Sequence, residues 1–346
     1  MLDVDITKKL GEFELRAKFS ITDEKTAILG ASGCGKSMTL KCIAGIETPD
    51  AGRIVLNDRV LYDSNKKINL PPQKRRVGYL FQNYALFPNM TVAQNIGFAL
   101  EGKTEKNNVV NEFINKLRLN GLENKYPSQL SGGQQQRTAL ARMLALDTEI
   151  IMFDEPLSAL DSFLKWELEQ ELLDIFGDFD RPILYVSHDR GEVFRLCDQI
   201  VILDKGEIVS NSTKHDLFEN PKSVTGTILT GCKNISPVFC RGNGIVIAED
   251  WGVGFKIPQG IDEDTIRFVG VRAHLMQKGA EYENVFNAQI INVIEDVFNW
   301  IVSLKLSPKA KKCFRWVVSK KEIARLQTGT NITVSMASEQ VLFLES

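Results

Sequence analysis

Short apolar runs alternate with amphipathic stretches along the chain up to about Phe218. The apolar runs are Thr26–Leu29, Ile150–Phe153, Ile183–Val186 and Ile200–Leu203. Their length and uninterrupted apolar character are typical of parallel strands that are buried on both faces. The stretches Asn111–Leu119 and Ser162–Phe176 instead carry apolar residues at helical spacing. Strands that alternate with helices predict an α/β sheet.

The pattern changes after Glu219–Pro237, a segment rich in turn-forming residues that is typical of a passage between domains. Beyond it, β-branched or aromatic runs are separated by turn residues. These runs are Gly244–Ala248, Gly254–Ile257, Ile266–Val271, Ala288–Ile294, Trp300–Leu306, Phe314–Val318, Asn331–Met336 and Gln340–Leu344. We expect a helical connector at Ser319–Leu326. The pattern predicts an α/β domain over residues 1–230 and a small β-barrel or sandwich over residues 231–346.

Composition narrows the function classes further. The formal net charge is −2 over 346 residues, which gives no electrostatic reason to expect nucleic acid as a partner. No apolar run reaches the length of a membrane span, and the N-terminus lacks the pattern of a secretion signal. We therefore expect a cytoplasmic protein. The six cysteines are scattered without a CxxC pair, so zinc or redox chemistry is not expected.

A glycine-rich string stands directly after the first predicted strand. It consists of Gly30, Ala31, Ser32, Gly33, Cys34, Gly35, Lys36 and Ser37, and Met38 follows it. Because it also opens a predicted helix over Lys36–Ala44, it has the context of a phosphate-binding P-loop. Its glycines let backbone N–H groups curl around phosphate oxygens at a helix N-terminus. We expect ATP here, with Lys36 reaching the β- and γ-phosphates and Ser37 ligating Mg²⁺.

Two further polar sites follow buried strands. Asp154 and Glu155 come directly after Ile150–Phe153, and His188 ends the strand that begins at Ile183. The carboxyl ends of strands are where open α/β sheets place ligands. We expect Asp154 to hold Mg²⁺ and Glu155 to act as general base for the attacking water. We expect His188 to orient Glu155 and that water.

A second helix N-terminus has the features of an anion site. The string Leu130, Ser131, Gly132, Gly133 and Gln134 precedes a predicted helix that runs to about Leu146. Ser131 and Gln134 have the spacing of a capping box, and the two glycines leave backbone N–H groups open. Because the P-loop already serves this chain's ATP, the second site is predicted to serve a phosphate of its own.

The P-loop, the LSGGQ string, Asp154-Glu155 and His188 occur in the order and spacing of the ABC transporter family, and residues 1–230 resemble its nucleotide-binding subunit. The resemblance implies a head-to-tail homodimer in which the signature, Leu130–Gln134, contacts the ATP held by the partner's Lys36. Gln82 matches the family's glutamine loop, which senses Mg²⁺ and couples to the permease.

The resemblance also implies a helical signature subdomain over about residues 83–145. Asp161 ends Ser158-Ala159-Leu160-Asp161, which matches the loop that links the two ATP sites. Family members stack adenine on an upstream aromatic residue, and Phe13 is assigned here, with a core-facing strand residue as the alternative. The apolar stretch Asn83–Leu100 is read as a docking groove for a permease helix, with ordinary core packing as the alternative.

The cassette stands without a fused membrane span, as in importers that use a substrate-binding protein. The resemblance implies integral-membrane permease subunits, a periplasmic or lipid-anchored binding protein, and a peripheral position on the cytoplasmic face of the membrane. Residues 284–346 resemble the small OB-like oxyanion-binding fold (TOBE/MOP type) of molybdate-import ATPases. In that family the fold can bind molybdate or tungstate as a feedback sensor, and a purely stabilising role is the alternative.

Four functions are weighed. The first is an import ATPase for molybdate, tungstate or a similar oxyanion. The second keeps the importer and changes the cargo to sulfate, polyamine, ferric iron or sugar. The third is a soluble ABC ATPase of DNA repair or translation; the short spacing between P-loop and signature and the single cassette argue against it. The fourth makes the chain chiefly an oxyanion sensor.

Overall fold

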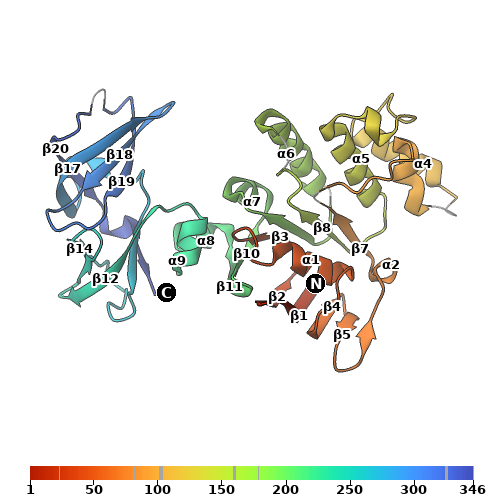
Figure 1. The fold of residues 1–346 in the computed structure, drawn as a ribbon, viewed down its shortest axis with the longest axis horizontal. Coiled ribbons are helices and arrows are strands. Elements are labelled where there is room, and N and C mark those ends of the chain that lie inside the picture. Colours follow the sequence, from red (N-terminus) through yellow and green to blue (C-terminus); the bar gives the residue numbers. More distant parts are fainter. Residues whose placement is uncertain are drawn as a thin grey trace. The chain divides into compact units, whose positions relative to one another are not determined.

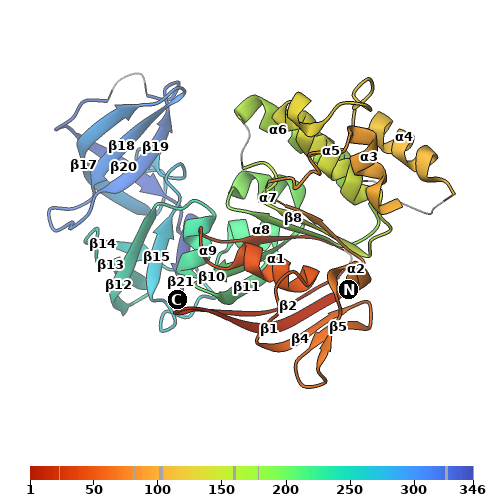
Figure 2. The same ribbon diagram turned by 45° about the vertical axis from the view of Figure 1, so that its right-hand side comes forward.

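The fold was analysed in a computed structural model, which describes residues 1–22, 24–81, 83–100, 104–158, 161–177, 179–323 and 326–345. The chain divides into two compact units, Met1–Lys214 and His215–Ser346. The division comes before the boundary at residue 230 that the sequence pattern indicates. Each unit is described here by itself (Figures 1 and 2).

The first unit is built on an 11-stranded sheet with the order β6-β5-β4-β1-β2-β11-β10-β3-β9-β8-β7. The strands are β1 (Leu2–Leu10), β2 (Phe13–Ile21), β3 (Lys25–Leu29), β4 (Ala51–Leu56), β5 (Arg59–Asp63), β6 (Ile68–Asn69), β7 (Val77–Leu80), β8 (Ile150–Asp154), β9 (Ile183–Ser187), β10 (Gln199–Asp204) and β11 (Glu207–Thr213). The segment β10-β3-β9-β8-β7 is parallel, whereas β1, β2, β4, β5 and β6 pair in antiparallel fashion. The strands β8 and β9 are buried along their whole length, as their apolar runs predict.

Helices lie around the parallel part of this sheet (Figure 2). They are α1 (Lys36–Ala44), α2 (Pro72–Arg75), α3 (Val92–Gly97), η1 (Phe98–Leu100), α4 (Lys106–Lys116), η2 (Pro127–Gln129), α5 (Gly132–Leu144), α6 (Ser162–Gly177) and α7 (Arg190–Leu196). The helices α3, α4 and α5 contact one another, and all three fall within the stretch from residue 83 to 145. Helix α1 has the predicted bounds, and α5 ends two residues before the predicted Leu146.

The second unit contains two five-stranded antiparallel sheets, with the orders β14-β13-β12-β15-β21 and β16-β20-β17-β18-β19. Its elements are α8 (Lys214–Glu219), α9 (Val224–Leu229), β12 (Asn234–Gly242), β13 (Ile245–Ala248), β14 (Val253–Lys256), β15 (Phe268–Val271), β16 (Gln277–Lys278), β17 (Asn284–Glu295), β18 (Asn299–Lys305), β19 (Phe314–Ser319), β20 (Asn331–Met336), η3 (Ser338–Gln340) and β21 (Val341–Leu344). One apolar core that includes Trp251, Phe255 and Trp316 joins both sheets. The predicted fold class, an α/β domain followed by a small all-β domain, is confirmed.

Two local expectations were wrong. The segment Glu219–Pro237 is not a linker without secondary structure, because it contains α9 and the start of β12. Ser223 caps α9 through the backbone N–H of Gly226, and the side chain of Thr227 packs beside Gly270. The described part of Ser319–Leu326 forms a turn after β19, without a helix. Within the ranges that the structure describes, no helix combines the length and the apolar character needed to cross a membrane.

Candidate functional site

The site lies at the carboxyl ends of three neighbouring parallel strands. β3 pairs with β9, and β9 pairs with β8, so the chain positions that follow Leu29, Asp154 and Ser187 meet at one edge of the sheet. Each strand is an apolar run that is buried on both faces, and its first exposed residues therefore come at its end. This topology brings together residues that are far apart in the sequence.

The loop from Gly30 to Gly35 leaves no room for side chains at its base. A Cβ on Gly30 would lie 2.2 Å from the carbonyl oxygen of Leu203 and 2.6 Å from Cys34 Sγ. Gly35 stands at the N-cap of α1 with φ 111°, and no side chain caps the helix there. The N-terminal N–H groups of α1 therefore face a loop whose residues Ala31–Gly33 are exposed. This is a phosphate-binding geometry.

Lys36 is held inside this loop. Its side chain is 5% exposed, and Nζ donates to the carbonyl oxygens of Gly30 at 2.9 Å and Ala31 at 3.0 Å. Nζ also lies 3.8 Å from Glu155 Oε1. The ammonium group is thus fixed at the mouth of the loop next to a carboxylate, where it can add charge to the backbone donors around an anion.

Ser37 and Asp154 form the predicted metal site. Ser37 Oγ donates to Asp154 Oδ1 at 2.7 Å, and the hydroxyl of Tyr79 donates to Asp154 Oδ2 at 2.8 Å. Burial, reinforced by the carboxylate of Asp154, raises the pKa of Tyr79. A hydroxyl and a carboxylate at this spacing are the hard oxygen ligands that Mg²⁺ prefers, so these residues fit the ion. The third predicted ligand, Gln82, lies outside the described residues.

Glu155 connects the phosphate loop to His188. Its Oε2 lies 3.2 Å from His188 Nδ1, while its other oxygen faces Lys36. Glu155 has φ 48°, in the left-handed region that is unfavourable for a side chain of this size. Its backbone N–H donates to the carbonyl of Val186 at 3.0 Å, which ties the strained residue to β9. The structure therefore brings Lys36, Glu155 and His188 into one row.

A partly buried charge network that sequence reasoning missed adjoins His188. Lys165 Nζ on α6 lies 2.6 Å from Asp189 Oδ2 and 2.7 Å from Glu192 Oε1. The other oxygen of Glu192 accepts from the hydroxyl groups of Ser187 and Tyr185. The two neighbours of His188 are therefore anchored on both sides. No motif marks this network, because its members are ordinary charged residues until the fold brings α6 and α7 together.

The signature string forms the N-terminus of α5. Ser131 Oγ accepts from the N–H of Gln134 at 3.3 Å, and Gln134 Oε1 accepts from the N–H of Ser131 at 2.9 Å, so the predicted capping box is present. Gly132 has open space around it, and Leu130 is buried. Figures 1 and 2 both show α5 with α4, in a different part of the unit from α1. The fold does not bring the signature to this chain's own Lys36.

The remaining predicted residues occupy defined places. Asp161 precedes α6, and its carboxylate accepts from the N–H of Leu164 at 3.1 Å. Phe13 is half-buried against the core. Its ring edge at Cζ would lie 3.4 Å from a Cβ added to Gly35 and 3.2 Å from one added to Gly206, so it packs beside both glycines. Met38 is half-buried against the same core. Burial raises the pKa of the Cys34 thiol, which favours a packing role over thiolate chemistry.

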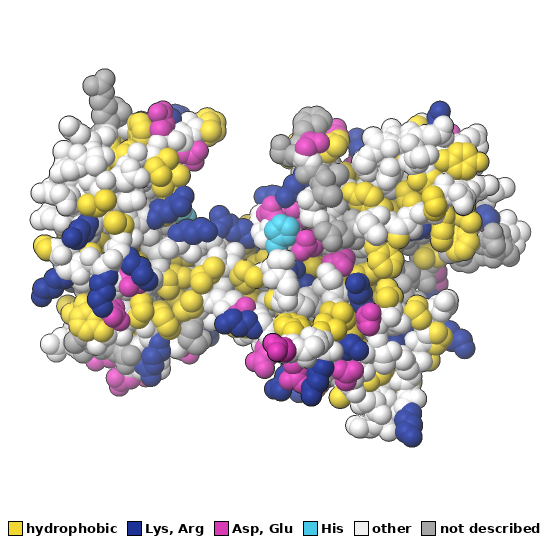
Figure 3. Space-filling view, viewed as in Figure 1, with side chains coloured by type: hydrophobic (Ala, Val, Ile, Leu, Met, Phe, Trp, Pro, Cys, Tyr) yellow, Lys and Arg dark blue, Asp and Glu magenta, His cyan; other side chains and the backbone are white. Residues whose placement is uncertain are grey.

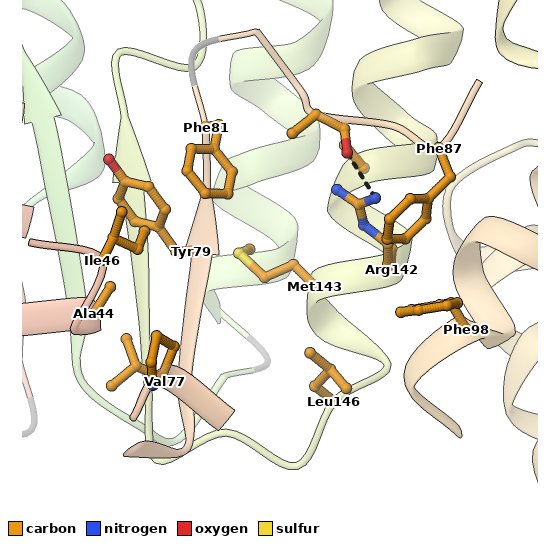
Figure 4. A pocket seen from close by; sticks show the side chains of 13 residues that line it. Ala44, Ile46, Val77, Tyr79, Phe81, Phe87, Phe98, Arg142, Met143 and Leu146 are labelled. Carbon is orange, nitrogen blue, oxygen red and sulfur yellow. Dashed lines mark hydrogen bonds between the residues drawn. The ribbon is translucent and has the colours of Figure 1, made fainter. Parts of the chain in front are cut away.

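An apolar groove of about 450 Å³ lies between β7 and α5 in the first unit (Figure 4). Its lining includes Ala85, Phe87 and Phe98 from the stretch predicted to dock a permease, together with Tyr79 and Met143. Arg142 crosses the groove, and its guanidinium group donates to the carbonyl oxygens of Tyr84 and Ala85 while lying over the Phe87 ring. Apolar side chains gather over this part of the first unit (Figure 3).

Comparison with known proteins places this site in a family. Residues 17–158 match the family model described as "ABC transporter". The chain is 39% identical over 238 residues to the spermidine/putrescine import ATP-binding protein PotA of Thermotoga maritima, covering 67% of this chain and 63% of that relative's length. It is 37% identical over 252 residues to the molybdenum import ATP-binding protein ModC of Paramagnetospirillum magneticum, covering 72% of this chain and 69% of that one.

A solved structure agrees with these relatives. The ATP-binding cassette MJ0796, in a dimeric post-hydrolysis state bound to ADP and Pi, matches with a TM-score of 0.53 at 28% identity. The match covers 62% of this chain and 99% of that cassette. The chain therefore belongs to the ABC transporter family, as one of its ATP-binding proteins.

Proposed function

We propose that this chain is the ATP-hydrolysing subunit of an ABC importer and that it works as a homodimer. The observation that carries the proposal is the row formed by Lys36, Glu155 and His188, beside the Ser37–Asp154 pair. One cationic group, one carboxylate and one imidazole converge where the loop would place a γ-phosphate. This arrangement supports hydrolysis, whereas ATP binding alone would not require Glu155 and His188.

The side chains divide the reaction between them. Lys36 binds the β- and γ-phosphates, and Ser37, Asp154 and Gln82 hold Mg²⁺, which neutralises phosphate charge when it is bound. Glu155 orients a water and accepts its proton, and His188 holds Glu155 in place through its Nδ1. The ion pairs of Lys165 with Asp189 and with Glu192 keep the His188 segment fixed. Most of the rate enhancement comes from positioning and charge.

The second helix N-terminus supports the homodimer. Ser131 and Gly132 at the start of α5 are exposed, and a Cβ on Gly132 would meet nothing within 4 Å. This chain's own P-loop lies in a different part of the unit (Figures 1 and 2). In a head-to-tail pair, Ser131, Gly133 and Gln134 contact the γ-phosphate bound by the partner's P-loop, and Asp161 links the two sites. The dimeric state of the matched cassette favours the same arrangement.

The groove between β7 and α5 is the proposed docking site for a permease helix. It is apolar, has room for side chains of a partner, and takes part of its lining from the predicted stretch, at Ala85, Phe87 and Phe98. Integral-membrane permease subunits and a periplasmic or lipid-anchored substrate-binding protein complete the proposed importer. The chain would then lie on the cytoplasmic face of the membrane.

Molybdate or tungstate is the proposed cargo. The resemblance of residues 284–346 to an oxyanion-binding fold and the similarity to a molybdenum import protein support it. A polyamine is the second candidate, because the relative at 39% identity is named for spermidine and putrescine, against 37% for the molybdenum import protein. The test is copurification with the permease, followed by ATPase assays with binding protein loaded with molybdate, tungstate, sulfate or spermidine. Stimulation by molybdate is expected, and stimulation by spermidine or sulfate alone would contradict the proposed cargo.

A further inference from the structure

Tyr79 belongs to both the groove and the predicted metal site. Its ring lines the groove and meets Phe81 edge-on, with the ring centroids 4.4 Å apart. Figure 4 shows its hydroxyl on the side of the ring away from Met143 and Arg142. That hydroxyl donates to Asp154 Oδ2 at 2.8 Å. A single side chain therefore reaches from a proposed partner surface to a predicted Mg²⁺ ligand.

The hydroxyl of Tyr79 fixes how the Asp154 carboxylate is turned. Asp154 is 5% exposed, and its two oxygens are held separately, Oδ1 by Ser37 and Oδ2 by Tyr79. Without the tyrosine, Oδ2 would be a buried oxygen with one fewer donor, and the carboxylate could rotate away from Ser37. Donors of this kind orient metal-ligating carboxylates, and their loss typically weakens metal binding by about 10- to 100-fold.

The position of the Tyr79 hydroxyl is set by the position of the ring that carries it. A movement of the ring would therefore lengthen or break the 2.8 Å hydrogen bond to Asp154 Oδ2. The ring is packed on one side by Phe81, which also lines the groove. Any occupant that shifts these two rings would shift the hydroxyl.

We propose that Tyr79 is a positioning residue that sets the Asp154 carboxylate for Mg²⁺ and makes the metal site responsive to the state of the groove. The proposal rests on the proposed ATPase function. It deepens that function by naming the contact through which a docked partner would act on the ATP site.

The first test compares two tyrosine-to-phenylalanine variants of the full chain. Tyr79→Phe keeps the ring in the groove and removes the hydroxyl. Tyr62→Phe is the matched control, because its buried hydroxyl also makes one hydrogen bond, to the Pro49 carbonyl at 2.7 Å, away from the site. The readouts are the Mg²⁺ concentration for half-maximal ATP hydrolysis and the affinity for Mn²⁺ with a non-hydrolysable ATP analogue, followed by electron paramagnetic resonance.

Tyr79→Phe should raise the half-saturating Mg²⁺ concentration and weaken Mn²⁺ binding by about tenfold, while the rate at saturating Mg²⁺ stays within about twofold. Tyr62→Phe should change neither. Equal metal affinities in the two variants would overturn the proposal. If the wild-type chain binds Mn²⁺ and the analogue but hydrolyses no ATP, the proposed function fails, and the Mn²⁺ measurement still decides this inference.

The second test examines the link to the groove. Phe81→Ala removes the ring that packs on Tyr79 and leaves the hydroxyl in place. It should raise the half-saturating Mg²⁺ concentration in the wild-type chain and have no further effect in the Tyr79→Phe chain, because the two changes act through one contact. The same shift in both backgrounds, or no shift in either, would overturn the proposed link.

Discussion

Two helices in the first unit follow glycine-rich segments that contain exposed residues. The side chains beside the two helix N-termini differ. Helix α1 starts at Lys36 with no side-chain cap, and its loop carries a buried ammonium group and adjoins Asp154 and Glu155. Helix α5 starts after Ser131 with a complete capping box formed by Ser131 and Gln134. Both termini offer backbone N–H groups to an anion.

The difference assigns a role to each terminus. The α1 terminus adjoins Lys36, the proposed metal ligands and the proposed base, so it is the proposed site of hydrolysis. The α5 terminus offers backbone donors next to the hydrogen bonds between Ser131 and Gln134. Donors alone can stabilise charge on a phosphate that another site holds. This difference between the two helix N-termini supports a composite ATP site that is shared by two copies of the chain.

The largest effect is expected from Lys36→Ala. Removing the buried ammonium group takes away the positive charge at the mouth of the phosphate loop, so ATP affinity should fall by about 100-fold or more and hydrolysis should be lost. Lys41→Ala is the control, because Lys41 lies in the last turn of the same helix. Equilibrium binding of a fluorescent ATP analogue measures the loss. Equal affinity in the two variants would contradict the assigned role of Lys36.

Glu155→Gln should separate binding from turnover. The amide cannot accept a proton, so the rate should fall by about 10²- to 10⁴-fold while ATP binding and ATP-dependent dimerisation remain. Glu149→Gln is the control, since Glu149 precedes the same strand β8 and forms ion pairs with Arg59 and Arg76 instead. Light scattering with ATP measures the dimer. Normal turnover in Glu155→Gln would show that the general base is misassigned.

Ser131→Arg should lower the rate of ATP hydrolysis by about 100-fold or more, because a bulky cation at the α5 terminus would block the phosphate held by the partner copy. The affinity of the P-loop at Lys36 for ATP should not change. Thr91→Arg is the matched control. Thr91 caps α3 with the same kind of capping box, completed by Gln94, so the cost to helix stability is comparable. If both variants lose turnover equally, loss of stability and not the signature explains the effect.

Phe13→Ala is expected to have the smallest effect. A stacked aromatic ring contributes about 1 kcal/mol, which corresponds to about a fivefold weaker ATP affinity. Phe13→Trp should retain the affinity. Because Phe13 also packs beside Gly35 and Gly206, a thermal denaturation curve of each variant is needed to separate adenine contact from packing. An unchanged ATP affinity in Phe13→Ala would contradict adenine stacking on Phe13 and support the alternative, a strand residue that faces the core.

The sequence predicted the α1 region well because its function depends on local chemistry. A strand, a glycine loop and a helix follow one another, and Lys36–Ala44 has the observed bounds of α1. The contact between Ser37 and Asp154 spans 117 residues. Asp154 ends β8, and Ser37 lies in the first turn of the helix that follows the loop after β3, so the parallel topology of these strands was enough to bring them together. The row of Glu155 and His188 follows from the same rule.

Contacts between side chains that lack a motif could not be predicted. Tyr79 lies on a short apolar strand, and nothing in its neighbourhood indicates that its hydroxyl reaches Asp154. Lys165 is one charged helix residue among several, and its partners are set by how α6 packs on α7. In the second unit, the strand patterns predicted the all-β fold. The boundary between the units comes after Lys214, before the residue 230 that composition indicated, because α9, capped by Ser223, belongs to the second unit.

The most direct test of the composite site mixes two inactive variants. Lys36→Ala lacks a working P-loop, and Ser131→Arg lacks a working signature. In a head-to-tail pair containing one of each, the intact P-loop of one copy faces the intact signature of the other, so mixing should restore ATP hydrolysis at one of the two sites. If subunit exchange is verified and the mixture stays as inactive as either variant alone, the account of a site shared between two copies is contradicted.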